Sequence, residues 1–89
     1  FGAAIDSQDR AGRTPLHQAA VRADHHVVFE LLAHGAHPNL PDCDGNSALH
    51  LARTAAIARR IVLAGADPNQ RNVAGELAGK FLDELSDSQ

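Results

Sequence analysis

One segment of this chain occurs twice, and the spacing between its two copies limits the fold more than any other feature. Residues 9–17 (DRAGRTPLH) align with residues 42–50 (DCDGNSALH), 33 residues later. A second pair, residues 31–39 (LLAHGAHPN) and 61–69 (IVLAGADPN), is only 30 residues apart, so the second unit is three residues shorter. Such a period is typical of stacked units, none of which can bury its apolar side alone.

Each unit carries the signals of two helices and a projecting turn. Thr14 can cap a helix, and Pro15 suits the first helical position, where a backbone N–H is not needed. Apolar residues then recur twice at helical spacing between residues 16 and 32. Gly35 suits a helix end, because glycine adopts the left-handed conformation at little cost. Residues 38–45 contain Pro, Asp and Gly and predict an extended turn.

The pattern resembles the ankyrin repeat family. Residues 14–19 (TPLHQA) fit that family's T-P-L-H-x-A motif in full, whereas the second unit keeps Ser-Ala-Leu-His at 47–50. The resemblance covers about residues 2–82 and implies an all-α solenoid of stacked helix–turn–helix units with projecting β-turn or hairpin loops. It divides the chain into the end of a preceding repeat (1–8), a repeat (9–41, the first unit), a shortened repeat (42–71, the second unit), a partial C-terminal capping repeat (72–85, the third unit) and an acidic polar tail (86–89).

Two departures from the family pattern bear on the fold. The three missing residues are nearly one helical turn, so either the first helix of the second unit or the turn after it is shortened around residues 53–56. In the third unit, residues 77–80 (LAGK) stand where TPLH would be. Four apolar residues that predict a closing helix keep helical spacing there: Leu77, Phe81, Leu82 and Leu85. No N-terminal cap corresponds to it, so the N-terminal face of the first unit is expected to be partly bare.

The charge balance argues against a basic surface for nucleic acid or membranes. Eight Lys and Arg residues face eleven Asp and Glu residues, but three of the acids lie in the last seven residues. Residues 1–82 therefore carry eight charges of each sign. Hydrophobic residues make up 44% of the chain and aromatic residues only 3%, which predicts a core of Ala, Leu, Val and Ile.

The cysteine content and the absence of targeting segments indicate where the protein works. One cysteine, Cys43, rules out an internal disulfide framework and fits a reducing compartment, so we expect an intracellular protein of the cytoplasm, the nucleus or both. No apolar run approaches the ~20 residues of a membrane span, and no signal-peptide pattern is present. The chain opens with Phe1 rather than methionine, so we expect a fragment of a longer protein.

Six histidines raise the question of a metal or catalytic site. The family resemblance implies that His17 and His50 hydrogen-bond within and between neighbouring units. Ser47 and His50 could form a nucleophile and base, but no acid orients the imidazole and no Gly-rich oxyanion turn follows. Residues 42–46 resemble the start of a calcium loop, but Arg53 stands where the bidentate Glu belongs. We therefore predict no catalytic residue, no metal site and no cofactor.

The remaining candidate is a protein-binding surface. In ankyrin-like stacks, the turn tips and the exposed side of the first helices form a concave face. The resemblance places eight residues of this chain there: Arg10, Arg13, Gln18, Val21, Arg22, Cys43, Asp44 and Asn46. The arginines make one end basic and suit it to carboxylate recognition.

Three further residues carry expectations of their own. Phe29 is a candidate for a second interface, because the apolar stripe predicts a solvent-facing side chain there, although a rotation of the helix would bury it instead. Asn39 and Asn69 occupy a hairpin position that is hydroxylated in some relatives. A turn-stabilising role is expected for both.

These features predict a non-catalytic module that binds another protein through the concave face of an ankyrin stack. Two alternatives stay open. One is a regulatory or targeting segment of a larger enzyme, channel or transcription regulator, and the other is self-association through the N-terminal face. Direct binding to nucleic acid or to a membrane is not expected.

Overall fold

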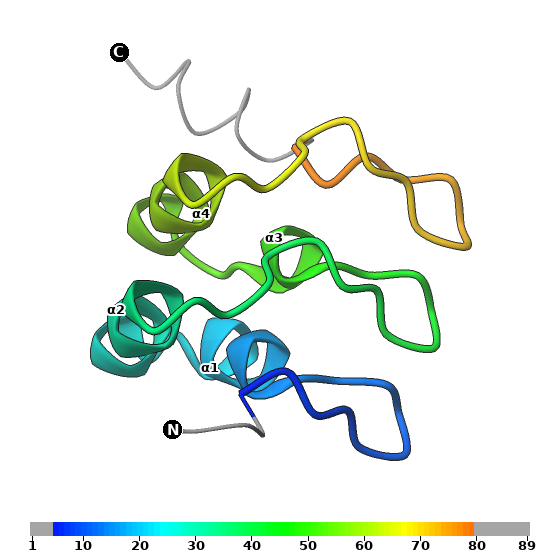
Figure 1. Cartoon of the computed structure of the whole chain (residues 1–89). Coiled ribbons are helices and arrows are strands. Elements are labelled where there is room, and N and C mark those ends of the chain that lie inside the picture. The colour runs from blue at the N-terminus through cyan, green and yellow to red at the C-terminus, as the bar shows by residue number, and fades with distance from the viewer. Residues whose placement is uncertain (1–4, 80–89) are drawn as a thin grey trace, which may run out of the picture.

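The helices lie in stacked pairs, and loops project from one side of the stack (Figure 1). The computed structural model of the chain describes residues 5–79. Four helices occur in this part: α1 Pro15–Arg22, α2 His25–Ala33, α3 Ala48–Leu51 and α4 Ala55–Leu63. Helix α1 packs against α2 and α3, and α4 packs against the same two helices. The predicted all-α, helix–turn–helix architecture is confirmed.

The helix ends of the first unit follow the sequence signals. The Thr14 side chain accepts a hydrogen bond from the backbone N–H of His17, and Pro15 occupies the first turn of α1. Helix α1 ends at Arg22, and the next residue, Ala23, adopts the left-handed conformation with φ 56°. Helix α2 ends just before Gly35, which has φ 90° and supplies the left-handed residue that stops the helix.

The three-residue deletion falls in the first helix of the second unit. Helix α3 has four residues against eight in α1, whereas α4 and α2 both have nine. The chain leaves α3 through Ala52 in an extended conformation (φ −62°, ψ 126°), and Thr54 then caps α4 by accepting a hydrogen bond from the N–H of Ile57. The structure thus decides between the two possibilities: the first helix is shortened and the second keeps its full length.

One core joins the helices of both units. Alanine is the commonest of its buried apolar residues, and the larger ones are Leu, Ile and Val. The helical members of this core are Leu16, Ala19, Ala20, Val28, Leu31, Ala48, Leu49, Ile57, Ala58 and Ile61. Small alanine side chains let neighbouring helices approach closely, which explains how the core forms with so few aromatic residues.

In the third unit, Leu77 lies in the hairpin and not in a helix. Arg71 and Leu77 form an isolated antiparallel β-bridge, and Ala78 is buried against the core. Leu77 is therefore not part of a helix, and the prediction of a closing helix is wrong for this residue. The other residues of that predicted helix, Phe81, Leu82 and Leu85, lie outside the described residues.

Candidate protein-binding surface

The projecting loops are joined to one another through their backbones. The N–H of Cys43 donates to the carbonyl of Ala11 at 2.8 Å, and the N–H of Val73 donates to the carbonyl of Asp44 at 2.9 Å. Each loop therefore fixes the next one along the stack. The result is a row of hairpins whose backbones are held while their tips face solvent.

Two glycines let these hairpins approach closely. Gly12 and Gly45 have φ of 77° and 76°, in the left-handed region. A Cβ atom on Gly12 would lie 2.8 Å from the backbone nitrogen of Cys43, and one on Gly45 would lie 2.8 Å from that of Val73. Real Cβ atoms do not come this close to backbone, so both positions require glycine for two independent reasons.

His17 joins the first unit to the second. Its Nδ1 accepts the backbone N–H of Thr14 at 3.0 Å, and its Nε2 lies 2.7 Å from the carbonyl oxygen of Asn46. Because a backbone N–H can only donate, Nδ1 carries no proton and Nε2–H donates to Asn46. The contacts within and between units that the family resemblance implies are confirmed for this histidine.

His50 makes the equivalent contacts one unit further along. Its Nδ1 accepts the N–H of Ser47 at 2.9 Å, and its Nε2 lies 2.9 Å from the carbonyl oxygen of Glu76. The Ser47 hydroxyl lies 3.0 Å from the same Nδ1, a distance that would also suit a nucleophile and its base. However, Ser47 is buried and cannot reach a substrate. The pair therefore starts helix α3 and joins two units.

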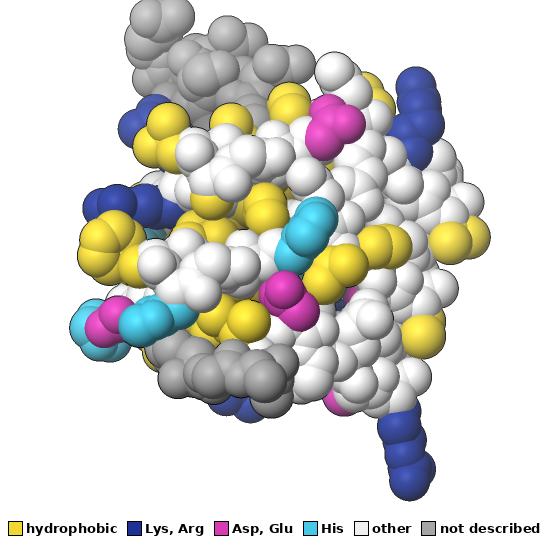
Figure 2. All heavy atoms as spheres, in the orientation of Figure 1, with side chains coloured by type: hydrophobic (Ala, Val, Ile, Leu, Met, Phe, Trp, Pro, Cys, Tyr) yellow, Lys and Arg dark blue, Asp and Glu magenta, His cyan; other side chains and the backbone are white. Residues whose placement is uncertain are grey.

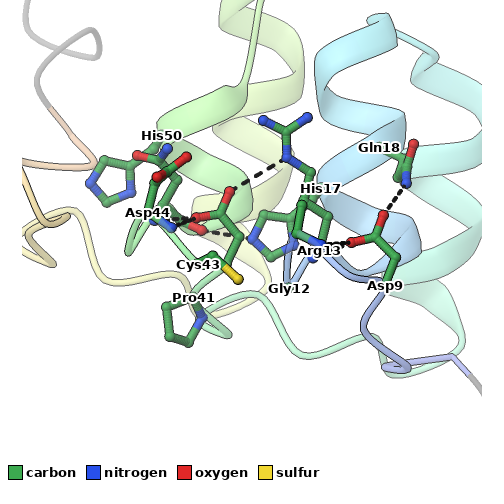
Figure 3. Close-up of polar contacts among 12 residues, drawn as sticks. Asp9, Gly12, Arg13, His17, Gln18, Pro41, Cys43, Asp44 and His50 are labelled. Carbon is green, nitrogen blue, oxygen red and sulfur yellow. Dashed lines mark hydrogen bonds and ion pairs between the residues drawn. The ribbon is translucent and has the colours of Figure 1, made fainter.

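Arg13 lies beside a buried carboxylate. Its Nε is 3.5 Å from Oδ2 of Asp42, and the two side chains are 36% and 1% exposed (Figure 3). The other oxygen of Asp42, Oδ1, accepts the backbone N–H groups of Asp44 and Asn46 at 2.9 Å each. Arg13 thus supplies the positive charge that offsets a desolvated aspartate of the next unit.

Two more of the predicted surface residues make contacts inside the protein. The Gln18 side chain donates to Oδ2 of Asp9 at 3.0 Å. The Asn46 side chain accepts from Nδ2 of Asn72 at 2.8 Å. Together with Arg13, these residues hold the hairpins in place, and only part of each remains available to a partner.

Most of the other predicted residues have side chains that are exposed to solvent. Arg10, Cys43 and Asp44 are exposed at the hairpin tips, and Arg22 is exposed at the last turn of α1. The Cys43 thiol lies 3.6 Å from the carbonyl of Arg10, so it bridges two neighbouring tips. Val21 is half-buried. We refer to the exposed set of Arg10, Arg22, Cys43 and Asp44 as the tip surface.

Phe29 lies elsewhere, on α2. Its side chain is 50% exposed, so it faces solvent as the apolar stripe predicts and is not turned into the core. The guanidinium carbon of Arg60, on α4, lies 4.4 Å from the centre of the Phe29 ring. This cation–π contact ties α2 to α4 on the outer side of the stack and does not join the tip surface.

The hairpin asparagine Asn39 bridges two units. Its side-chain Nδ2 donates to the carbonyl of Gly65 at 3.1 Å, and its Oδ1 accepts the N–H of Asp67 at 2.8 Å. Both ends of the amide are therefore used in fixing the next unit. The turn-stabilising role expected for Asn39 is confirmed.

A hollow of about 530 Å³ opens beside α1. It is lined by Asp9, Pro15, Val27 and three of the predicted surface residues, Arg13, Gln18 and Arg22.

Charged side chains of both signs are interspersed on the face shown in Figure 2, which carries no continuous basic area. Within residues 5–79, no three His, Cys, Asp or Glu side chains gather closely enough to hold a metal ion, and no helix is long and apolar enough to cross a bilayer.

Paired helices, stacked hairpins and histidines that bond to the next unit define a helical repeat protein. The family model described as ankyrin repeats (3 copies) matches residues 1–72. This chain belongs to the ankyrin repeat family. Ankyrin repeat domains are generally protein-binding modules and are typically non-catalytic.

Two curated proteins are similar to parts of the chain. The mouse (Mus musculus) NF-kappa-B inhibitor delta is 42% identical over 50 residues, which are 56% of this chain and 15% of that protein. The Arabidopsis thaliana potassium channel AKT2/3 is 48% identical over 44 residues, which are 49% of this chain and 6% of that protein. The chain thus spans a small part of the length of either relative.

Proposed function

We propose that this ankyrin domain is a non-catalytic module that binds a partner protein through the tip surface and the adjoining side of α1. The observation that carries the proposal is the combination of a fixed backbone and exposed side chains at the hairpin tips. Cys43 and Val73 donate to the preceding hairpins at 2.8 and 2.9 Å, while their side chains remain exposed. A surface that is already ordered loses little conformational entropy on binding.

The charges of this surface indicate what it would select. Arg10 and Arg22 are exposed at one end, and Asp44 is exposed further along the row of hairpins. Arginine at the first end favours carboxylates of the partner, because its planar guanidinium can donate two parallel hydrogen bonds. The partner segment is expected to carry acidic residues at that end.

Single charge reversals test this proposal. The chain and its Arg10→Glu and Arg22→Glu variants are immobilised, and bound proteins from cell extract are compared by quantitative mass spectrometry. Proteins that depend on the tip surface are then purified and titrated against each variant. We expect a Kd at least about tenfold higher for either reversal, which corresponds to about 1.4 kcal/mol.

Arg59→Glu is the matched control, because Arg59 is exposed on α4, away from the hairpins. This variant should keep the partners and the affinity of the parent chain. The proposal fails if Arg10→Glu and Arg22→Glu bind as tightly as Arg59→Glu, provided that all four proteins melt at the same temperature.

A second candidate is a regulatory or targeting segment within a larger protein. The similarity to 15% of an NF-kappa-B inhibitor and 6% of a potassium channel favours it, because similar repeats occur there inside much longer chains. Measuring binding to this domain in the parent protein, with and without the tip-surface variants, distinguishes a docking role from a purely spacing role.

The unpaired Cys43 is consistent with the reducing interior of the cell, in the cytoplasm or nucleus, as the place of action.

A further inference from the structure

The missing turn of α3 leaves the second turn of α1 without a helix beside it. His17 faces the second unit, because its Nε2 lies 2.7 Å from the carbonyl oxygen of Asn46. Val21 follows four residues later and therefore lies on the same side of α1, one turn further along. Helix α3, however, ends at Leu51 after four residues, so it accompanies only the first turn of α1.

The side chain of Val21 shows the effect of the missing turn. His17 is 1% exposed, whereas Val21, on the same side of the helix, is half-buried. Leu51 and Ala52, at the end of α3, pack against the core, but Val21 is not among the described residues that do so. All three apolar side chains remain partly open to solvent.

Arg53 lies beside Val21, where a longer α3 would continue. It follows the extended residue Ala52, and its Nη1 donates to the carbonyl oxygen of Val21 at 3.5 Å. This contact places the end of α3 next to the second turn of α1. We call the surface formed by Val21, Leu51, Ala52 and Arg53 the junction site.

The guanidinium of Arg53 gives the junction site a positive charge. Arg53 is exposed and forms no ion pair within residues 5–79. Its hydrogen bond to Val21 is long, and arginine has five N–H donors, so the guanidinium can bind a carboxylate through two shorter bonds. Arg22 and Asp24 both line the hollow beside α1, and their charges offset each other.

We propose that the junction site binds a segment of the partner protein that carries an apolar side chain next to an acidic one. The apolar side chain covers Val21 and Leu51 in the place of the missing turn, and the carboxylate pairs with Arg53. The site follows from the deletion and not from the repeat itself, because α1 has its full eight residues. The inference rests on the proposed function, since it assigns a further contact of the same partner on the adjoining side of α1.

A displayed library of random short peptides supplies the probe, with the chain itself as the target. We expect the selected peptides to share an Asp or Glu beside Leu, Ile, Val or Phe. Representative peptides are synthesised and titrated against the parent chain and its variants. A selection that enriches no such pattern would overturn the proposal.

Restoring the missing turn tests the site without removing any of its side chains. A copy of residues 20–22 (AVR) is inserted between Ala52 and Arg53, which gives α3 the length of α1. The new turn should cover Val21 and raise the Kd of the peptides at least about tenfold. Because the insertion adds a positive charge, weaker binding of an acidic peptide would not be a charge effect. A melting temperature no lower than that of the parent chain would show that the inserted-turn chain folds.

Two single substitutions test the two halves of the site separately. Arg53→Glu should raise the Kd at least about tenfold, and much less for a peptide in which the acidic residue is replaced by its amide. Val21→Thr keeps the shape of the side chain but replaces a methyl group with a hydroxyl, so it should also weaken binding. Arg59→Glu, the same charge change at an exposed position of α4, is the matched control and should leave the Kd unchanged.

Arg10→Glu distinguishes this inference from the proposed function. Weaker binding to the Arg10→Glu chain alone would support the tip surface and overturn the junction site. Weaker binding to the inserted-turn and Arg53→Glu chains alone would support the junction site and count against the tip surface. Weaker binding to all three chains would support both surfaces, and an equal Kd for all of them would overturn both.

Discussion

Arg10 and Arg13 show how two residues of one type, three positions apart, come to have different roles. Arg10 is exposed at a hairpin tip, whereas Arg13 lies 3.5 Å from the buried carboxylate of Asp42. Treated as members of one basic surface, they would be exchanged together to test binding. The structure separates them, because a change at Arg13 also leaves a buried charge without its partner.

The first prediction concerns this pair of arginines. Arg13→Ala should destabilise the domain by about 1–3 kcal/mol, because it removes the only cation beside Asp42 in the described part of the chain. Arg10→Ala is the control and should change the stability by less than about 0.5 kcal/mol. Urea unfolding measures both. Equal stability of the two variants would show that Asp42 does not need Arg13.

The second prediction concerns the core. Leu49→Ala should destabilise by about 2–5 kcal/mol, because Leu49 is only 2% exposed and its loss leaves a cavity between α3 and its neighbours. Leu63→Ala removes the same atoms from a side chain that is 84% exposed, and it should melt like the parent chain. Calorimetry of both variants would contradict the assigned register if Leu49→Ala melted at the parent's temperature.

At this scale the sequence predicted local contacts better than distant ones. Thr14, Pro15 and Gly35 act as the signals within a few residues of them indicate, since helix capping is decided locally. The pairing of Arg13 with Asp42 joins residues 29 positions apart. Nothing in the sequence alone says that one side chain turns toward the next hairpin rather than toward solvent, so it was assigned to the binding surface.

Among the elements, the hairpins depend on glycine to different extents. The third prediction is that Gly45→Ala destabilises more than Gly75→Ala. Both residues have positive φ, 76° and 83°, so both variants carry backbone strain of about 1–3 kcal/mol. At Gly45 the new Cβ would also lie 2.8 Å from the backbone nitrogen of Val73, while at Gly75 no atom of residues 5–79 outside its chain neighbours lies within 4 Å. Thermal melts compare the two, and equal loss would mean that the hairpins are not in close contact.

The fourth prediction concerns the contact between the two outer helices. Arg60→Ala should cost about 0.5–1 kcal/mol, because the guanidinium of Arg60 lies over the exposed ring of Phe29. Arg59→Ala, the adjacent position on α4, is the control. A double-mutant cycle with Phe29→Leu isolates the contact, and a coupling energy of zero would show that the ring and the cation act independently.

For the whole molecule, the repeat period was sufficient to predict the class of fold, because every unit must bury its apolar side on a neighbour. The repeat alignment also located the three-residue deletion, but it did not say whether the first helix of the second unit or the turn after that helix was shortened. The structure shows the loss in α3, which still buries Ala48 and Leu49 with only four residues. The end of the stack was harder to predict, since the third unit lacks the helix-starting motif.

The short α3 has a consequence for how the domain is degraded. Ala52 is extended and the exposed Arg53 follows it, so a basic residue lies in an accessible backbone segment between two helices. Proteases bind their substrates as extended strands, and a helix must unwind before it can be cut. In brief digestion with trypsin, we expect cleavage after Arg53 to be faster than cleavage after Arg22, Arg59 or Arg60 of the helices, as the fragment masses would reveal. Lost helical length thus becomes a point of cleavage, at which a single cut divides the second unit between α3 and α4.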